Sequence, residues 1–493
     1  MRRNTKRPLW TNTAAGVRAR NRVIIAALAA ALLVLWQLHL SSKTGSFFGD
    51  FRAFYCAGAA LAHGAQPYAA APLYACERAP MPFGLYHADS GVAVPAPLPG
   101  YALVLLMPLG MLPYLAACAF WFAILMATSA VSVFALAALL DRPIDAALWA
   151  LAVGFAVIVI PFGELGSIVM ASIVCMALAL RRGAWTWAAV AGAFAMILPH
   201  IGLPVMLGAF LFVPVMRARI AVVAVVLAIL DVLAGGWRTA LAYVFDVLPA
   251  HARSEIGSNA QYGLTWALHS LGASDRAAIA GGEVSYALMI ALGLFASWKI
   301  LSRQRDAAYV VLVPPAFAVL GGTFVHLTQI MIAIPAALLL FDRARGAARV
   351  MFGSAALLIA FPWASILGQP LLMLVYALVC GIFARSLLGA NASVALRIAL
   401  GSVLLCAAVL IAGYHFGAGL STNVHGLSAQ QGLAQSSWGE YIRAQRAGSG
   451  PAWWIAKAPT WIGLALLALG CAYALVKKDL VAPVAVEQVP VAP

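Results

Sequence analysis

Long apolar runs recur along almost the whole chain, and they constrain its fold more than any other feature. A membrane-spanning helix needs about 20 mostly apolar residues. Such runs occupy 23–40, 98–140, 145–162, 166–181, 184–198, 201–216, 218–235, 278–300, 307–322, 325–341, 350–364, 370–388, 397–415 and 455–476. The run 98–140 is too long for one straight span, and Pro108 and Pro113 predict a short helix followed by a long one. The pattern predicts an all-α, polytopic integral membrane protein with eleven to fourteen spans.

The composition agrees with this class. Hydrophobic residues make up 64% of the chain and charged residues 10%, with a mean hydropathy of +0.94. Soluble domains are roughly 45–50% apolar and about a quarter charged. The composition therefore excludes a soluble nucleic-acid binder, a disordered chain, a collagen-like chain and a small disulfide scaffold.

The distribution of basic residues predicts the orientation in the membrane. Lys and Arg number 31 against 16 acidic residues, a net charge of +15, and Lys/Arg-rich loops stay in the cytoplasm. With both termini inside, the outer basic residues are Lys43, Arg52, Arg78, Arg238, Arg253, Arg276, Arg443, Arg446 and Lys457. Residues 1–22 and 477–493 are then cytoplasmic tails around a transmembrane domain at 23–476, whose long outer loops are 41–97, 236–277 and 416–454. The first run has no clear cleavage site, which predicts a retained anchor.

The first outer loop contains a predicted amphipathic helix. Apolar residues at 47, 51, 54, 55, 58, 61 and 62 follow a helical period, which predicts a helix at the membrane surface, stopped by Gly64 and Pro67. Asp50 stands at its start and has two interpretations. It is either the N-cap, whose pKa would be depressed, or a carboxylate that accepts a proton from a hydroxyl substrate.

These residues resemble a known family. The run Asp50-Phe51-x-x-Phe54-Tyr55-x-Ala57-Gly58, followed by Gly64-x-x-Pro67-Tyr68, resembles the first-loop signature of the polyprenol-phosphate-mannose-dependent mannosyltransferases, glycosyltransferase family 87 of the GT-C superfamily. Later segments fit in order: Pro97-Leu98-Pro99 with Pro108 and Leu112-Pro113, Gly163-Glu164-Leu165-Gly166, Leu198-Pro199-His200, Ser258-Asn259-Ala260-Gln261, and His326. The resemblance covers residues 20–345. Glu164, Gly166 and His200 depart from the family's usual Gln, Asn and Lys, and these departures leave the donor sugar and the acceptor class open.

The resemblance implies a GT-C-like bundle and a reaction. A sugar, mannose in the family, would move from a polyprenyl-phosphate donor to a hydroxyl of a lipid or glycan acceptor, with inversion, at the periplasmic or exterior face of the cell membrane. Asp50 would be the catalytic base. The expected substrate-binding residues are Arg52, Tyr55, Glu164, His200, Arg253, Asn259, Gln261 and His326. We expect no cofactor and no metal ion, and the expected partners are membrane lipids and the two substrates, not nucleic acid.

The charge-based topology independently places Asp50, Glu164, His200, Asn259, Gln261 and His326 on the outer face. Each has a structural alternative as well. Glu164 suits a helix cap, the two histidines suit satisfied positions within the bundle, and Asn259 and Gln261 suit ordinary loop residues. The intramembrane Asp231 is either functional or paired with Arg238.

Several further alternatives stay open. Cys56 and Cys76 share an outer segment where a disulfide is permitted, or they are two free thiols, whereas the other five cysteines lie in apolar runs. The aromatic residues of 416–454, Trp438 among them, suit an interfacial belt or a platform for a sugar. The rival functions are a transporter or flippase of lipid-linked saccharides, a non-catalytic scaffold, and a ligase for a preassembled glycan.

Overall fold

The computed structural model describes residues 14–44, 47–79, 91–417, 432–445 and 450–480, and within them every regular element is helical. The first half of the chain forms α1 (Ala14–Thr44), α2 (Gly49–Ala62), α3 (Ala70–Glu77), α4 (Gly100–Gly110), α5 (Tyr114–Leu140), α6 (Ile144–Gly154), α7 (Ile160–Phe162), α8 (Gly166–Arg181), α9 (Trp185–Ala195), α10 (Pro199–Phe212) and α11 (Arg217–Ala242). The second half forms α12 (Leu248–Ser254), α13 (Leu264–Ser270), α14 (Asp275–Gln304), α15 (Tyr309–Gly321), α16 (Ile334–Arg343), α17 (Gly346–Ile359), α18 (Leu372–Ser386), α19 (Ala392–Phe416), α20 (Ala434–Gln445) and α21 (Pro451–Lys477).

The helices confirm an all-α, multi-pass membrane protein. Within the described residues, seven segments are long and apolar enough to cross a membrane: Gly16–Lys43, Tyr114–Leu140, Ile144–Phe162, Pro214–Ser254, Asp275–Gln304, Ala392–Phe416 and Pro451–Lys477. Shorter apolar helices are α4, α8, α10, α15, α17 and α18. The total number of spans and their orientation stay predictions.

Proline and glycine shape the helices where the sequence is irregular. The long run 98–140 divides as predicted into a short α4 and a long α5, with Pro113 directly before α5. The run 325–341 was predicted as one span, but it begins with the 3-10 segment Leu327–Ala333 before α16. Helix α11 is kinked at Gly235 and Gly236, whose backbone angles are not helical.

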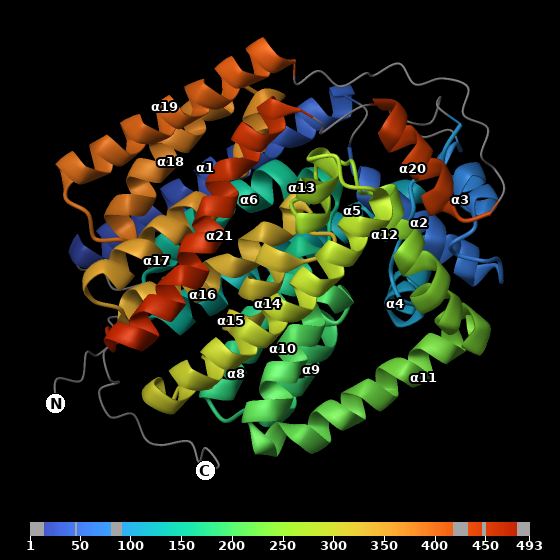
Figure 1. Cartoon of the computed structure of the whole chain (residues 1–493), viewed down its shortest axis with the longest axis horizontal. Coiled ribbons are helices and arrows are strands. Elements are labelled where there is room, and N and C mark those ends of the chain that lie inside the picture. Colours follow the sequence, from blue (N-terminus) through green and yellow to red (C-terminus); the bar gives the residue numbers. More distant parts are fainter. Residues whose placement is uncertain (1–13, 45–46, 80–90, 418–431, 446–449, 481–493) are drawn as a thin grey trace.

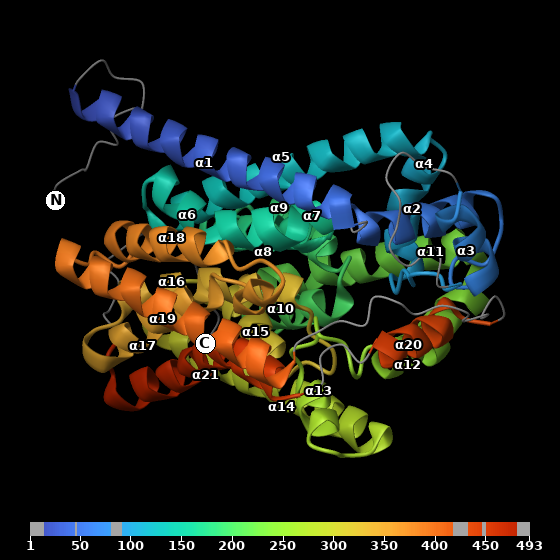
Figure 2. The same ribbon diagram turned by 90° about the horizontal axis from the view of Figure 1, so that it is seen from above.

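Figures 1 and 2 show the same two ends of the bundle. Helices α2, α3, α4, α12 and α20 gather at one end, and α16, α17 and the beginnings of α1 and α19 lie at the other. Side chains predicted to be cytoplasmic form ion pairs between turns: Arg142 pairs with Asp342, and Arg181 Nη2 lies 2.5 Å from Asp306 Oδ2. The turns are therefore joined by ion pairs, and short helices gather at one end of the bundle.

Helix α2 is fixed firmly at that second end. Its predicted position as a helix is confirmed, and most of its residues are buried against other parts of the protein. A Cβ atom added at Gly110 would lie 2.3 Å from Ala59 N, which means that α2 and α4 touch through their backbones. Cys56 and Cys76 form a disulfide that joins α2 to α3, which resolves the alternative left open by the sequence.

Candidate functional site

A glycine turn after α7 brings a second carboxylate to the start of α2. Phe48 N donates a 2.8 Å hydrogen bond to Pro161 O, which ties the two segments together. Gly163 has a φ of 76°, and a Cβ atom there would lie 2.6 Å from Phe51 Cβ. Only glycine permits this backbone and this close approach. Glu164, the next residue, is consequently held within electrostatic reach of Asp50.

Asp50 lies in the first turn of α2 and is partly buried. The N-cap is Phe48, in a left-handed conformation, so the interpretation of Asp50 as N-cap is wrong. Burial first, and then the charges of Glu164 and Glu255, raise the pKa of Asp50 well above its ordinary value, although His326 opposes this. The expectation of a depressed pKa is therefore also wrong, because neighbouring carboxylates and the loss of water outweigh the favourable helix start.

Glu164 is 8% exposed, and its Oε2 accepts a 2.8 Å hydrogen bond from Leu165 N at the start of α8. Burial raises its pKa, while His326 and the hydrogen bond to Leu165 act in the opposite direction. The structural alternative of a helix cap is wrong, because the N-cap of α8 is Leu165 and no side chain caps this helix; Glu164 belongs to the carboxylate cluster around Asp50.

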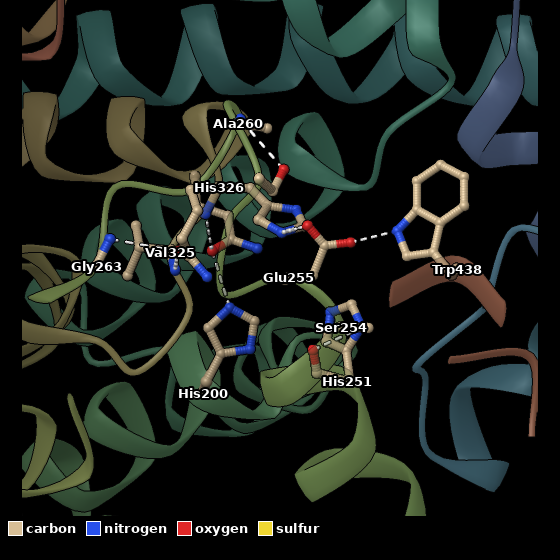
Figure 3. A network of polar contacts seen from close by, with 12 residues as sticks. His200, His251, Ser254, Glu255, Ala260, Gly263, Val325, His326 and Trp438 are labelled. Atoms are coloured by element: carbon tan, nitrogen blue, oxygen red, sulfur yellow. Dashed lines mark hydrogen bonds and ion pairs between the residues drawn. The ribbon is translucent and has the colours of Figure 1, made fainter. Parts of the chain in front are cut away.

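Glu255 and His326 form the charged pair at the centre of the site (Figure 3). Glu255 follows α12, and its Oε2 lies 3.6 Å from His326 Nε2, while its Oε1 accepts a 2.5 Å hydrogen bond from Trp438 Nε1 on α20. Burial alone would raise the pKa of Glu255, but His326 and Trp438 lower it to about 2. Burial would lower the pKa of His326, but Glu255, Glu164 and Asp50 raise it. The imidazole of His326 thus interacts with three carboxyl groups, which favour its protonated form.

Two further histidines lie beside this pair. His200 Nε2 is 3.0 Å from Gln329 Oε1, and the same oxygen accepts a hydrogen bond from His326 N. The rings of His200 and His251 lie 4.9 and 5.0 Å from the ring of Phe324, measured between centroids. Both imidazoles are therefore part of one polar group around His326.

The Ser258–Gln261 region holds the backbone segment that carries His326. Gln261 pairs with His326 in an antiparallel β-bridge, and its Oε1 accepts hydrogen bonds from Val325 N at 2.5 Å and Gly263 N at 3.3 Å. Gln261 is fully buried, whereas Asn259 is partly exposed. Gln261 consequently acts on the backbone beside His326 instead of facing a substrate.

Three residues predicted to bind substrate lie elsewhere. Arg52 is buried with its guanidinium under Tyr114 and donates to the carbonyl oxygens of Glu77 and Ala79. Tyr55 donates a 2.9 Å hydrogen bond to Leu112 O. Residues two apart on a helix face different directions, so Arg52 cannot share the side of Asp50. Arg253 is exposed on α12.

Asp231 has a structural role in this end of the bundle. Its Oδ1 accepts a 3.0 Å hydrogen bond from Tyr101 N at the start of α4, while Arg238 lies over the ring of Trp237. Asp231 therefore caps α4 from a helix far away in sequence, and the predicted pairing with Arg238 is wrong.

Sequence reasoning missed Glu255, His251 and Gln329, and it treated Trp438 only as an outer aromatic residue. One signal was present: His251 and Glu255 are four residues apart, the spacing of one helical face, within the predicted outer loop 236–277. Their partner His326 is about seventy positions away, so no local pattern revealed the pair.

The site offers proton transfer and anion binding. Within the described part of the chain, no group of three or more His, Cys, Asp and Glu side chains is arranged to hold a metal ion, and the expectation of a metal-free reaction stays a prediction. Comparisons with protein-family models, curated proteins and solved structures gave no match. Inferences about activity therefore depend on the site itself and on the resemblance of its motifs.

Proposed function

We propose that the protein is a membrane glycosyltransferase that moves a sugar from a polyprenyl-phosphate donor to a hydroxyl of a lipid or glycan acceptor. The observation that carries this proposal is the position of Asp50: a carboxyl at the start of α2, within electrostatic reach of Glu164, Glu255 and His326, whose pKa is raised. The resemblance of the Asp50 motif to family 87 suggests mannose as the sugar. The site would face the periplasm or the exterior, as the Lys/Arg distribution predicts.

The reaction assigned to Asp50 transfers one proton and exchanges one bond at the anomeric carbon. The acceptor hydroxyl gives its proton to the Asp50 carboxylate, and the acceptor oxygen bonds the anomeric carbon from the side opposite the phosphate. The bond from that carbon to the phosphate oxygen breaks, and its electron pair leaves with the polyprenyl phosphate. A carboxylate with a raised pKa is a stronger base than an ordinary one, because proton affinity rises with pKa.

The leaving phosphate needs positive charge. Arg52 is turned away and Arg253 lies outside the site, so of the predicted cationic groups His326 is the one in place. A protonated imidazole beside the departing oxygen would stabilise the charge that develops there, and the contact with Glu255 favours that form because it raises the pKa of His326. His200 is the other predicted group that lies beside His326.

The test is the variant Asp50→Asn, assayed with labelled polyprenyl-phosphate mannose and a membrane lipid extract as the source of acceptor. Loss of a general base typically costs about 10² to 10⁴ in rate, and we expect a loss in that range at equal protein level. Asp275→Asn is the matched control, because Asp275 is an exposed acid on α14. Undiminished transfer by Asp50→Asn would show that Asp50 is not the catalytic base.

The rival function, transport of lipid-linked saccharides, gives a different product. In sealed proteoliposomes a flippase moves the labelled lipid across the bilayer and forms no new glycosidic bond. A transferase yields a labelled product with a new linkage to the acceptor. Labelled lipid that changes sides but never changes covalently would replace the proposed activity with transport.

A further inference from the structure

Among the described residues, Lys457 on α21 is the most deeply buried cationic side chain outside the site. It is fully buried, and its Nζ lies 3.5 Å from the ring centroid of Trp266, 5.3 Å from that of Tyr262 and 5.9 Å from that of Trp453. Burying a basic group without a carboxylate beside it costs free energy. Such a position in a membrane protein points to a function.

The contact that Lys457 makes leads directly to the site. Its Nζ donates a 2.6 Å hydrogen bond to Gln261 O, and an ammonium and a neutral amine can both donate this bond. One turn further along α21, Trp461 Nε1 donates a 2.9 Å hydrogen bond to Tyr262 O. Two consecutive carbonyl groups of the 260–263 loop are thus held by one helix.

The held loop in turn fixes the backbone of His326. Gln261 and His326 form the β-bridge, Tyr262 N donates to Val325 O at 2.6 Å, and Leu327 N donates to Ala260 O at 3.0 Å. The imidazole of His326 extends from this backbone toward Glu255 (Figure 3). A shift of the loop would therefore move the imidazole relative to its carboxylate.

We propose that Lys457 is a positioning residue of the site. Its Nζ, surrounded by the rings of Trp266, Tyr262 and Trp453, holds Gln261 O and thereby keeps His326 in contact with Glu255. This inference rests on the proposed function only where it concerns turnover. The orientation of His326 is a separate property that can be measured without any substrate. Lys457 itself touches no reacting group, because the rings and the loop enclose it.

The charged and titratable groups that face His326 determine its apparent pKa. They come from four different parts of the fold: Glu255 and His251 from the α12 region, Glu164 from the turn before α8, Asp50 from α2, and His200 from α10. Since Glu255 is the nearest charge, loss of this contact would lower the apparent pKa of His326 more than a change at any other member.

The experiment compares Lys457→Met, Lys457→Arg and Ser297→Ala in full-length protein in lipid nanodiscs. Ser297 is a fully buried polar residue on α14 that donates to Leu294 O of its own helix, which makes it the matched control. Modification of His326 by diethyl pyrocarbonate is followed by peptide mass spectrometry from pH 5 to 9. We expect the apparent pKa of His326 to fall in Lys457→Met, to recover partly in Lys457→Arg, whose guanidinium still donates, and to stay at the wild-type value in Ser297→Ala.

Turnover gives the second measurement. A displaced catalytic group can cost about 10² in rate, so Lys457→Met should lower kcat by about ten- to a hundredfold with KM changed less than twofold. Wild-type protein without transfer activity would refute the proposed function, while the His326 titration would still decide the role of Lys457.

An unchanged His326 titration in folded Lys457→Met would overturn the proposal. If Lys457→Met does not fold, Trp461→Phe replaces it, because this variant removes only the second donor and keeps an aromatic ring. A smaller fall in the apparent pKa of His326 in Trp461→Phe then supports the positioning role. A titration identical to wild type in that variant contradicts it.

Discussion

Asp50 illustrates a conflict between stability and chemistry at a single residue. Its carboxyl is partly buried beside Glu164 and Glu255, and both burial and these neighbours oppose its ionisation. A group in such surroundings disfavours the folded state when it is charged, and active sites commonly contain groups of this kind. Replacement by a neutral isostere should therefore remove function and add stability.

This expectation has a defined pH dependence. The folded-state pKa of Asp50 lies above its ordinary value of 3.8, so the stability associated with its protonated form is lost as pH rises through the folded-state pKa. Asparagine cannot ionise. We therefore expect Asp50→Asn to unfold at a higher temperature than wild type near neutral pH, with the difference shrinking toward zero below pH 4.

Thermal unfolding in detergent, measured at several pH values between 4 and 8, tests this directly. Glu283→Gln serves as the control, since that carboxyl is exposed on α14, whereas Asp275 lies 3.2 Å from His269 Nδ1. An Asp50→Asn variant whose unfolding temperature differs from wild type by the same amount at every pH would contradict the assigned cause.

The sequence predicted the members of the site better than their roles. Asp50, Glu164 and His326 were predicted and do lie together, because their motifs sit at helix ends on one side of the predicted topology. Arg52 was misassigned, since its neighbourhood in sequence suggested a shared site that helical geometry forbids. Glu255 was missed because its interaction with His326 depends on a tertiary contact between distant segments.

At the scale of the helices, hydropathy gave boundaries that are often close to the observed ones. The predicted run 166–181 coincides with α8, because polar and glycine-containing turns bound it on both sides. The run 325–341 failed as a single span, because its first part is a 3-10 segment that packs under the site. Apolar composition alone does not distinguish a spanning helix from a buried, tightly wound segment.

The contact between α2 and α4 gives a prediction for this scale. Gly110→Ala places a Cβ atom 2.3 Å from Ala59 N, and backbone cannot yield as a flexible side chain can. We expect a loss of about 1–3 kcal/mol in unfolding free energy and a fall in transfer activity, because α2 carries Asp50.

Gly401→Ala is the matched control for this change. Gly401 lies inside α19 with no atom within 4 Å of an added Cβ, and alanine favours a helix over glycine. Denaturant or thermal unfolding of both variants in the same detergent gives the comparison. Equal stability of the two variants would show that the α2–α4 contact tolerates a larger residue.

For the whole molecule, the segregation of polar groups into two sets is the main feature. The carboxylates and histidines around His326 come from α2, α10, the α12 region and the turn before α8, whereas Arg–Asp pairs join turns elsewhere, at Arg142 and Arg181. The predicted orientation puts the first set outside. Single reporter cysteines at Glu440 on α20 and at Ser302 near the end of α14, both exposed, distinguish the two orientations.

In intact cells we expect a membrane-impermeant maleimide to label Glu440→Cys and to leave Ser302→Cys unlabelled until the membrane is opened. The native free cysteines of the described region are buried or partly buried. Labelling of the parent protein without a reporter cysteine measures their contribution and is subtracted as background. Labelling of Ser302→Cys in intact cells, with protection of Glu440→Cys, would reverse the orientation.

The disulfide between α2 and α3 also bears on how the protein matures. Disulfides form in oxidising compartments and are rare in the cytosol, so the bond between Cys56 and Cys76 agrees with the predicted outer position of their loop. With that predicted orientation, the helix that carries Asp50 receives its covalent attachment only once the loop has left the reducing side. The prediction makes translocation, oxidation and the completion of this site successive stages in the biogenesis of one protein.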